Sequence, residues 1–184
     1  MTTAVAPTTG TTTWNLDPAH ATVGFAVKHL MISTVRGHFN DISGTVVVDE
    51  ANLAGAKIEV TIAAASIDTR VEQRDAHLRS PDFFDAERFP TITFRSTRLE
   101  RGGAADFRLI GELTIRGVTR EVALDVTDEG RGTDPWGGTR AAFSLRGKIN
   151  RADFGLTWNQ ALEAGGVLVS DEVKIEAEVQ FVRS

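Results

Sequence analysis

Apolar and polar residues alternate along most of the chain, in stripes that run through 23–27, 58–62, 107–115, 118–126 and 173–181. Successive side chains of a strand point to opposite faces, so each stripe predicts a half-buried strand. We expect strands near 14–17, 21–29, 34–48, 56–65, 91–98, 106–116, 119–127, 139–150 and 172–182. These strands have to hide both an apolar face and their edges. The pattern therefore predicts an all-β protein whose strands either close or pack together to cover them, and we favour a barrel of about eight strands.

The strand predicted over 34–48 changes face part-way along. Val35, Gly37 and Phe39 share one face, whereas the set Ile42, Gly44, Val46 and Val48 shares the other. This switch predicts a β-bulge near Asn40–Asp41 that bends the strand around the barrel wall. We also expect a tight hairpin at Gly117 and a longer hairpin loop over 128–138.

Residues 68–90 interrupt the strand pattern. Val71–Arg79 suits a short helix with Asp68 or Thr69 as its N-cap, and Ser80–Pro81 is typical of a second helix start. We therefore expect a short helical insertion near 70–85. Such an insertion either plugs one end of the barrel or forms a lid over a cavity mouth, and the two roles are compatible.

Length and composition narrow the class of protein. The 184 residues predict a single domain over 14–184, preceded by a flexible leader over 1–13 that consists mostly of Thr with some Ala, Pro and Gly. The net charge of −5 lacks the basic footprint of a nucleic-acid-binding protein. The leader does not resemble a secretory signal, and no segment approaches the roughly 20 apolar residues of a membrane span. We therefore expect a cytoplasmic protein.

Few residues suggest catalysis or metal binding. The absence of Cys excludes disulfides and thiolate chemistry, and the four histidines show no short metal-ligand spacing. No nucleophile elbow or phosphate-binding glycine loop occurs, so we predict no catalytic residue, no metal and no cofactor. His29 lies on the same face of its strand as Val23, Phe25 and Val27, which we expect to point inward, and it is near the end of that strand. It is either a hydrogen-bonded residue at the barrel rim or a contact for the head group of a ligand.

Two arginines keep the inward parity of their strands. Arg98 extends the stripe of Ile92 and Phe94, and Arg120 lies in register with Val118. Both lie near strand ends, where a guanidinium can reach solvent while its stem stays buried. Alternatively, an arginine at the mouth of an apolar cavity would bind a phosphate or carboxylate by paired hydrogen bonds.

Several segments resemble motifs of the YceI-like family, in the order in which the family has them. They are residues 17–25 (DPAHATVGF), 27–30, 35–39 (VRGHF), 74–85 (RDAHLRSPDFFD), 89–90, 111–120 (GELTIRGVTR), 134–137 (DPWG) and 150–156 (NRADFGL). The resemblance covers about residues 14–182. It implies a lipocalin-like antiparallel barrel that holds a polyisoprenoid or similar long-chain amphiphile in an elongated apolar cavity. Many members of the family carry a secretory signal.

The sequence and the resemblance together favour a non-catalytic carrier or sequestering protein for such a lipid. The predicted contacts of the lipid tail are Phe25, Val27, Phe39, Ile62, Phe83, Phe84, Phe94, Phe143 and Trp158. The predicted contacts of its head group are His29, Arg98, Arg120 and His77. Burial of a long apolar tail predicts loose selectivity for the head group.

Two other functions stay open at this point. The first is an enzyme that acts on an isoprenoid-like substrate, with His29 or His77 as the acid or base. The second is an interaction module whose barrel is packed solid, since the ten Phe could fill much of a small barrel. We also expect that a homodimer could cover an exposed barrel mouth.

Overall fold

The structure is a computed structural model that describes residues 10–184. Its strands are β1 (Thr11–Leu16), β2 (Thr22–His29), β3 (Ser33–Phe39), β4 (Ile42–Asp49), β5 (Asn52–Ala63), β6 (Ile67–Asp68), β7 (Thr91–Arg101), β8 (Asp106–Ile115), β9 (Val118–Thr133), β10 (Thr139–Asn150) and β11 (Val169–Arg183). The helix α1 (Glu72–Arg79) and the 3-10 turns Pro18–His20, Ala64–Ser66 and Arg151–Phe154 complete the chain.

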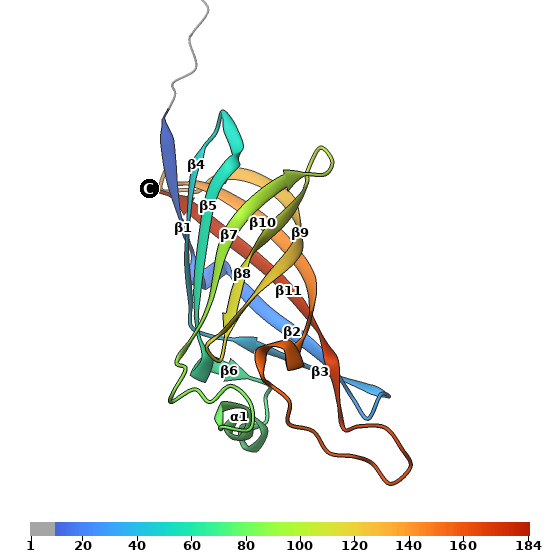
Figure 1. The fold of residues 1–184 in the computed structure, drawn as a ribbon. Coiled ribbons are helices and arrows are strands. Elements are labelled where there is room, and N and C mark those ends of the chain that lie inside the picture. Colours follow the sequence, from blue (N-terminus) through green and yellow to red (C-terminus); the bar gives the residue numbers. More distant parts are fainter. Residues whose placement is uncertain (1–9) are drawn as a thin grey trace, which may run out of the picture.

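The strands form a closed antiparallel barrel (Figure 1). Neighbours follow the order β1-β4-β5-β7-β8-β9-β10-β11, and β11 pairs back with β1, which closes the ring. The long β11 pairs with β1 near its C-terminal end, where Phe181 lies opposite Leu16, and with β2 near its N-terminal end. Together β1 and β2 therefore act as one bent strand beside β11, and β3 and β4 form the next. The predicted barrel of about eight strands is confirmed.

The bend at Asn40–Asp41 is a break between two strands, so the predicted β-bulge within one strand is wrong. The backbone amide of Asn40 donates to the carbonyl of Ser66, and the amide of Ala63 donates to the carbonyl of Asp41. These bonds tie the two residues to the last residue of β5 and to the 3-10 turn that follows it. As a result β3 pairs with β2 and β6, whereas β4 pairs with β1 and β5.

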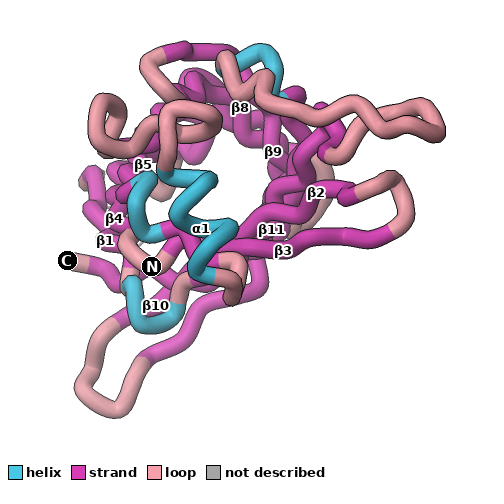
Figure 2. The backbone as a smooth tube through the Cα atoms, turned by 90° about the horizontal axis from the view of Figure 1, so that it is seen from below, coloured by secondary structure: helices cyan, strands magenta, loops and turns pink. Residues whose placement is uncertain are grey.

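The helix predicted over 71–79 is confirmed, and the second helix start at Ser80–Pro81 is wrong. The hydroxyl of Ser80 donates to the carbonyl of His77 at 2.6 Å, which closes the last turn of α1 instead of opening a new helix. Residues 81–90 follow as a series of turns. Asp68 and Thr69 do not cap α1, since the side chain of Asp68 accepts from the amide of Arg70. Viewed from below, α1 lies across one end of the barrel (Figure 2).

The leader and the hairpin loop before β10 are both shorter than expected. Strand β1 begins at Thr11 because residues 11–13 pair with residues 47–49 of β4, so three residues of the expected leader belong to the barrel. Residues 1–9 of the expected leader lie outside the described residues. The loop expected over 128–138 shrinks to 134–138, because β9 continues to Thr133. The longer β9 pairs with β10 through a shift in register between Ala142 and Phe143.

Candidate functional site

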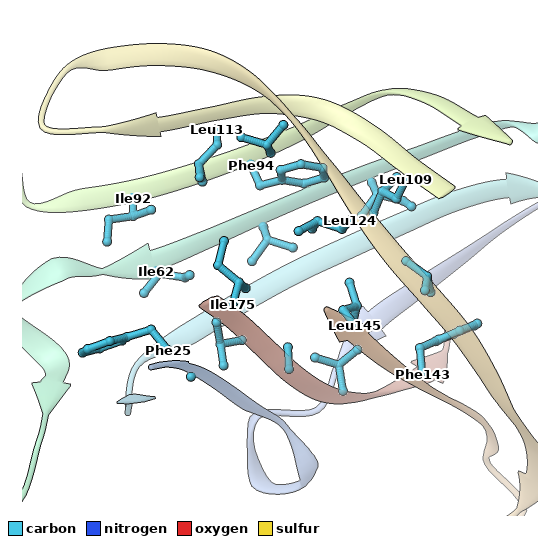
Figure 3. A pocket seen from close by; sticks show the side chains of 18 of the residues that line it. Phe25, Ile62, Ile92, Phe94, Leu109, Leu113, Leu124, Phe143, Leu145 and Ile175 are labelled. Carbon is cyan, nitrogen blue, oxygen red and sulfur yellow. The ribbon is translucent and has the colours of Figure 1, made fainter. Parts of the chain in front are cut away.

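The barrel encloses an apolar cavity of about 350 Å³, which is within the usual range for ligand pockets. Every strand of the closed ring contributes to its lining. Figure 3 shows inward-pointing side chains from several strands around the ring, among them Ile62, Leu113, Leu124 and Ile175. The interior is therefore not packed solid.

The period of two along each strand builds this lining. On β11, Val173, Ile175, Ala177 and Val179 all face the cavity, and the residues between them are polar. Glycines in the wall make room for large inward rings. A methyl group built on Gly37 would lie 2.5 Å from Phe25 Cζ, and one on Gly111 would lie 2.5 Å from Phe94 Cζ.

Eight of the nine predicted tail contacts line the cavity. They are Phe25, Val27, Phe39, Ile62, Phe83, Phe84, Phe94 and Phe143. Trp158 is outside this lining. Its ring packs edge-on against His77 at 4.8 Å and tilted against Phe83 at 5.3 Å, between ring centroids. Trp158 thus packs against a lining residue without belonging to the lining itself. Contact of these residues with a ligand stays a prediction.

The structure does not bring the four predicted head-group residues together at the cavity. Arg98 points outward, because a register shift between Ser96 and Arg98 reverses the parity of β7. Its Nε lies 2.8 Å from Glu100 Oε1 on the outer surface. The inward orientation expected for Arg98 is therefore wrong. Arg120 keeps its parity, but it is exposed and donates to the carbonyl of Thr119. Its position matches the rim alternative.

The two predicted histidines lie at the same end of the barrel as α1. His77 Nε2 is 2.8 Å from Asp82 Oδ2, and the ring meets Phe83 edge-on with 5.1 Å between centroids. Since Phe83 lines the cavity, His77 lies one side chain away from it. His29 is half-buried at the end of β2, opposite Ser33 and Val169, and is not part of the lining.

Three charged residues of the lining were not predicted from the sequence: Asp128, Arg131 and Arg151. The guanidinium of Arg131 lies over the ring of the buried Trp14, 5.4 Å from its centroid, and Nη1 is 3.7 Å from Glu50 Oε1. Asp128 and Arg131 fall in the segment expected to be a loop, so parity could not assign them a face.

Arg151 is a buried charge held by backbone carbonyls. Its guanidinium donates to the carbonyls of Leu156 at 2.7 Å, Trp158 at 2.9 Å and Ser170 at 2.9 Å. Burial lowers the pKa of Arg151 from its ordinary value. Because its donors are engaged with the backbone, Arg151 fastens the segment after β10 and leaves the cavity close to fully apolar.

Other kinds of site find little support in the part of the chain that the structure describes. Residues 10–184 contain no cluster of three or more His, Cys, Asp or Glu that could hold a metal ion. In the same range, no helix has the length and apolar character needed to cross a membrane.

Comparison with known proteins gives matches over most of the chain. The family model described as the YceI-like domain matches residues 14–181. A UPF0312 protein of Staphylococcus aureus is 38% identical over 171 residues, which cover 92% of this chain and 97% of that protein. Protein YceI of Escherichia coli is 44% identical over 137 residues, covering 74% of this chain and 71% of that protein.

Solved structures show the same architecture. The crystal structure of Burkholderia cenocepacia BcnA has a TM-score of 0.78 at 27% identity and covers 90% of this chain and 98% of its own. A YCEI protein of Campylobacter jejuni has a TM-score of 0.72 at 35% identity, with 84% and 88% covered. A polyisoprenoid-binding domain from Saccharophagus degradans shares the fold, with a TM-score of 0.66 at 16% identity and coverage of 93% and 98%.

Proposed function

Because this chain belongs to the YceI-like family, we propose that it binds a polyisoprenoid or similar long-chain amphiphile in the barrel cavity. It acts as a non-catalytic carrier or sequestering protein for that lipid. The observation that carries the proposal is the apolar cavity, which is lined from every side by aliphatic and aromatic side chains. The fold is shared with a domain that is described as polyisoprenoid-binding.

The lining fits an apolar chain better than a polar metabolite. Burial contributes roughly 25 cal/mol per Å² of apolar surface, so affinity grows with the length of the tail. The charged groups of the lining are largely engaged within the protein, as Arg151 is with carbonyls and Arg131 is with Trp14. We therefore expect loose selectivity for the head group. Among the head-group candidates, His77 is the best placed, since it contacts Phe83 of the lining.

The direct test is uptake of a polyprenyl phenol by delipidated protein, followed by native mass spectrometry. Ala177 faces the cavity from β11, and its neighbour Glu178 faces outward. We expect Ala177→Phe to weaken uptake more than about tenfold by filling the cavity, and Glu178→Phe to change it less than about twofold. Equal uptake by both variants would refute binding inside the barrel. Comparable affinity for a short water-soluble phosphate without a tail would also contradict the proposal.

The enzymatic alternative is separated by analysing the lipid after incubation. A carrier returns the bound lipid unchanged. Turnover that is lost in His29→Ala or His77→Ala would instead support acid–base catalysis. A single apo mass with no uptake would support a barrel that acts through its surface.

A homodimer and a cytoplasmic location stay predictions. Light scattering on the purified protein tests the first, and fractionation of the native cells tests the second. Neither result changes the expected uptake, because the cavity is enclosed by the strands of one chain.

A further inference from the structure

The hairpin between β2 and β3 exposes three consecutive large apolar residues at its tip. Leu30 is 37% exposed, Met31 60% and Ile32 81%. Single exposed apolar residues are common on protein surfaces, but an apolar run at a projecting tip is not. Figures 1 and 2 both show this hairpin projecting from the barrel beside the loop that precedes β11.

The turn itself does not explain these residues. Leu30 and Met31 have φ of 53° and 58°, in the left-handed region that Gly, Asn and Asp occupy most readily. The amide of Ile32 donates to the carbonyl of His29 at 3.2 Å, so Leu30 and Met31 are the central residues of the turn. An Asn-Gly pair would form this turn with less strain. The sequence thus places long apolar side chains where the backbone disfavours them.

A second tip is fastened to the first. The amide of Leu30 donates to the carbonyl of Leu168 at 2.8 Å, and the neighbouring Val167 is 39% exposed. The cavity reaches the base of this paired structure, because Val27 and Val169 both belong to its lining. The exposed apolar tip therefore lies within three residues of the apolar lining, both along β2 and along the segment that leads into β11.

The size and charge of the tip indicate its partner. A stable protein interface buries about 800 Å² on each side, over some 20 residues, whereas four projecting side chains offer far less. Glu163 is the single charged residue in 30–34 and 161–169, so the two tips carry almost no charge to desolvate. A narrow, convex, uncharged apolar tip suits shallow insertion into lipid.

We propose that the tip formed by Leu30, Met31, Ile32 and Val167 docks onto the surface of a lipid bilayer. Docking there would bring the base of the hairpin, where the cavity lining begins, against the membrane from which a lipid is taken. Only the purpose of docking, which is to take a lipid from the membrane, rests on the proposed function. Docking itself is measured independently of cavity binding.

The experiment is co-sedimentation of the full chain with phosphatidylcholine vesicles. In the test variant, Leu30→Asn, Met31→Gly and Ile32→Ser are combined, which removes the apolar side chains and supplies the residues that the turn prefers. We expect vesicle binding to fall at least about tenfold without a lower melting temperature. Because the tip is nearly uncharged, binding should change little when phosphatidylglycerol or salt is added.

Trp136→Ser is the matched control. Trp136 is 86% exposed in the turn before β10. The start of β10 pairs with the C-terminal end of β11, where Arg140 lies opposite Val182. The hairpin that carries the tip pairs with the other end of β11, where His29 lies opposite Val169. The two apolar sites thus flank opposite ends of β11, roughly 40 Å apart. Loss of vesicle binding in Trp136→Ser and not in the tip variant would overturn the proposal. So would a wild-type dimer that the tip variant converts to a monomer, with no vesicle binding by either.

A separate measurement distinguishes docking from cavity binding. The tip variant should take up a polyprenyl phenol from detergent as the wild type does, since the cavity lining is unchanged. If the wild type binds vesicles but takes up no lipid, the proposed function fails while docking stands. If it takes up lipid but does not sediment with vesicles, docking fails while the proposed function stands.

Discussion

The barrel wall and the cap at its lower end are stabilised in different ways. In the wall, inward residues such as Ile175 are only half-buried, because they border the cavity, and the strands are joined by continuous ladders. In the cap, made of β6, α1, residues 80–90 and residues 151–168, buried charged side chains bind backbone groups. Arg151 and Asp75 are both about 95% buried. The wall can therefore exchange its contents, whereas the cap depends on individual side chains.

The largest effect expected from this difference is that of Arg151→Met. The change leaves the backbone carbonyls of Leu156, Trp158 and Ser170 without their arginine donor, whereas the carbonyl of Val169 keeps a hydrogen bond from Asn159. We expect the free energy of unfolding to fall by about 3–5 kcal/mol in urea denaturation. The control is Arg120→Met, which removes an exposed arginine and should stay within about 0.5 kcal/mol of the wild type. Equal losses in the two variants would show that the cap does not depend on Arg151.

A matched pair of isoleucines compares packing in the two regions directly. Ile67 in the cap is 2% exposed, whereas Ile175 borders the cavity. We expect Ile67→Ala to cost about 3–4 kcal/mol, because it opens a new void in a packed region. Ile175→Ala should cost about 1–2 kcal/mol, since its neighbours already border open space. Denaturation midpoints of the two variants test this order. Equal costs would mean that the cavity is collapsed or occupied in solution.

The difference between wall and cap also explains which parts of the fold and of the site could be predicted from the sequence. Parity identified the wall strands and accounts for the six predicted lining residues that lie on them, because a side-chain period of two is a local property. The other two, Phe83 and Phe84, lie in the turns after α1, where parity does not apply. Parity failed at Arg98, where a register shift in β7 reverses the face. It also assigned no face to Arg131, because β9 runs on through glycines that suggest a loop.

The cap could not be predicted in the same way. Arg151 and Asp75 are surface residues by type, and they are buried only because carbonyls and amides from other segments converge on them. No local pattern encodes that convergence. The helix could be predicted from residues 71–79, but the turns that follow it depend on Ser80 bonding back to His77.

A smaller effect is expected at Asp75, which joins α1 to the segment after β6. Its Oδ1 accepts from the amide of Thr69 at 2.9 Å and from the hydroxyl of the same residue at 2.5 Å. Asp75→Ala removes both bonds and should cost about 2–3 kcal/mol in urea denaturation. Asp75→Asn keeps an acceptor oxygen and should recover about half of that loss. If Asn is as damaging as Ala, the charge and not the acceptor geometry stabilises the cap.

The smallest effect is expected for a polar contact on the barrel wall. The contrast with the cap predicts that the stability of the wall depends little on single charged residues. Asp17 follows β1 at the bend toward β2, and its Oδ2 lies 2.6 Å from Arg140 Nη1 and 2.8 Å from His20 Nδ1. The hydrogen bond from Arg140, assisted by His20, lowers the pKa of Asp17 to about 2. The ionised form is thus the one that stabilises the fold.

This contribution is present above the ordinary pKa of an Asp, near 3.8, and is lost as the pH falls through the folded value of about 2. Asp17→Asn should therefore cost about 1–2 kcal/mol at neutral pH, and the cost should shrink below pH 3.8 and become small only below about pH 2, when unfolding is followed across that range. Asp125→Asn is the control, because its partner Arg108 is more than half exposed and the pair should contribute under about 0.5 kcal/mol. A cost of Asp17→Asn that is independent of pH would mean that its hydrogen-bond geometry, and not its charge, holds the bend between β1 and β2.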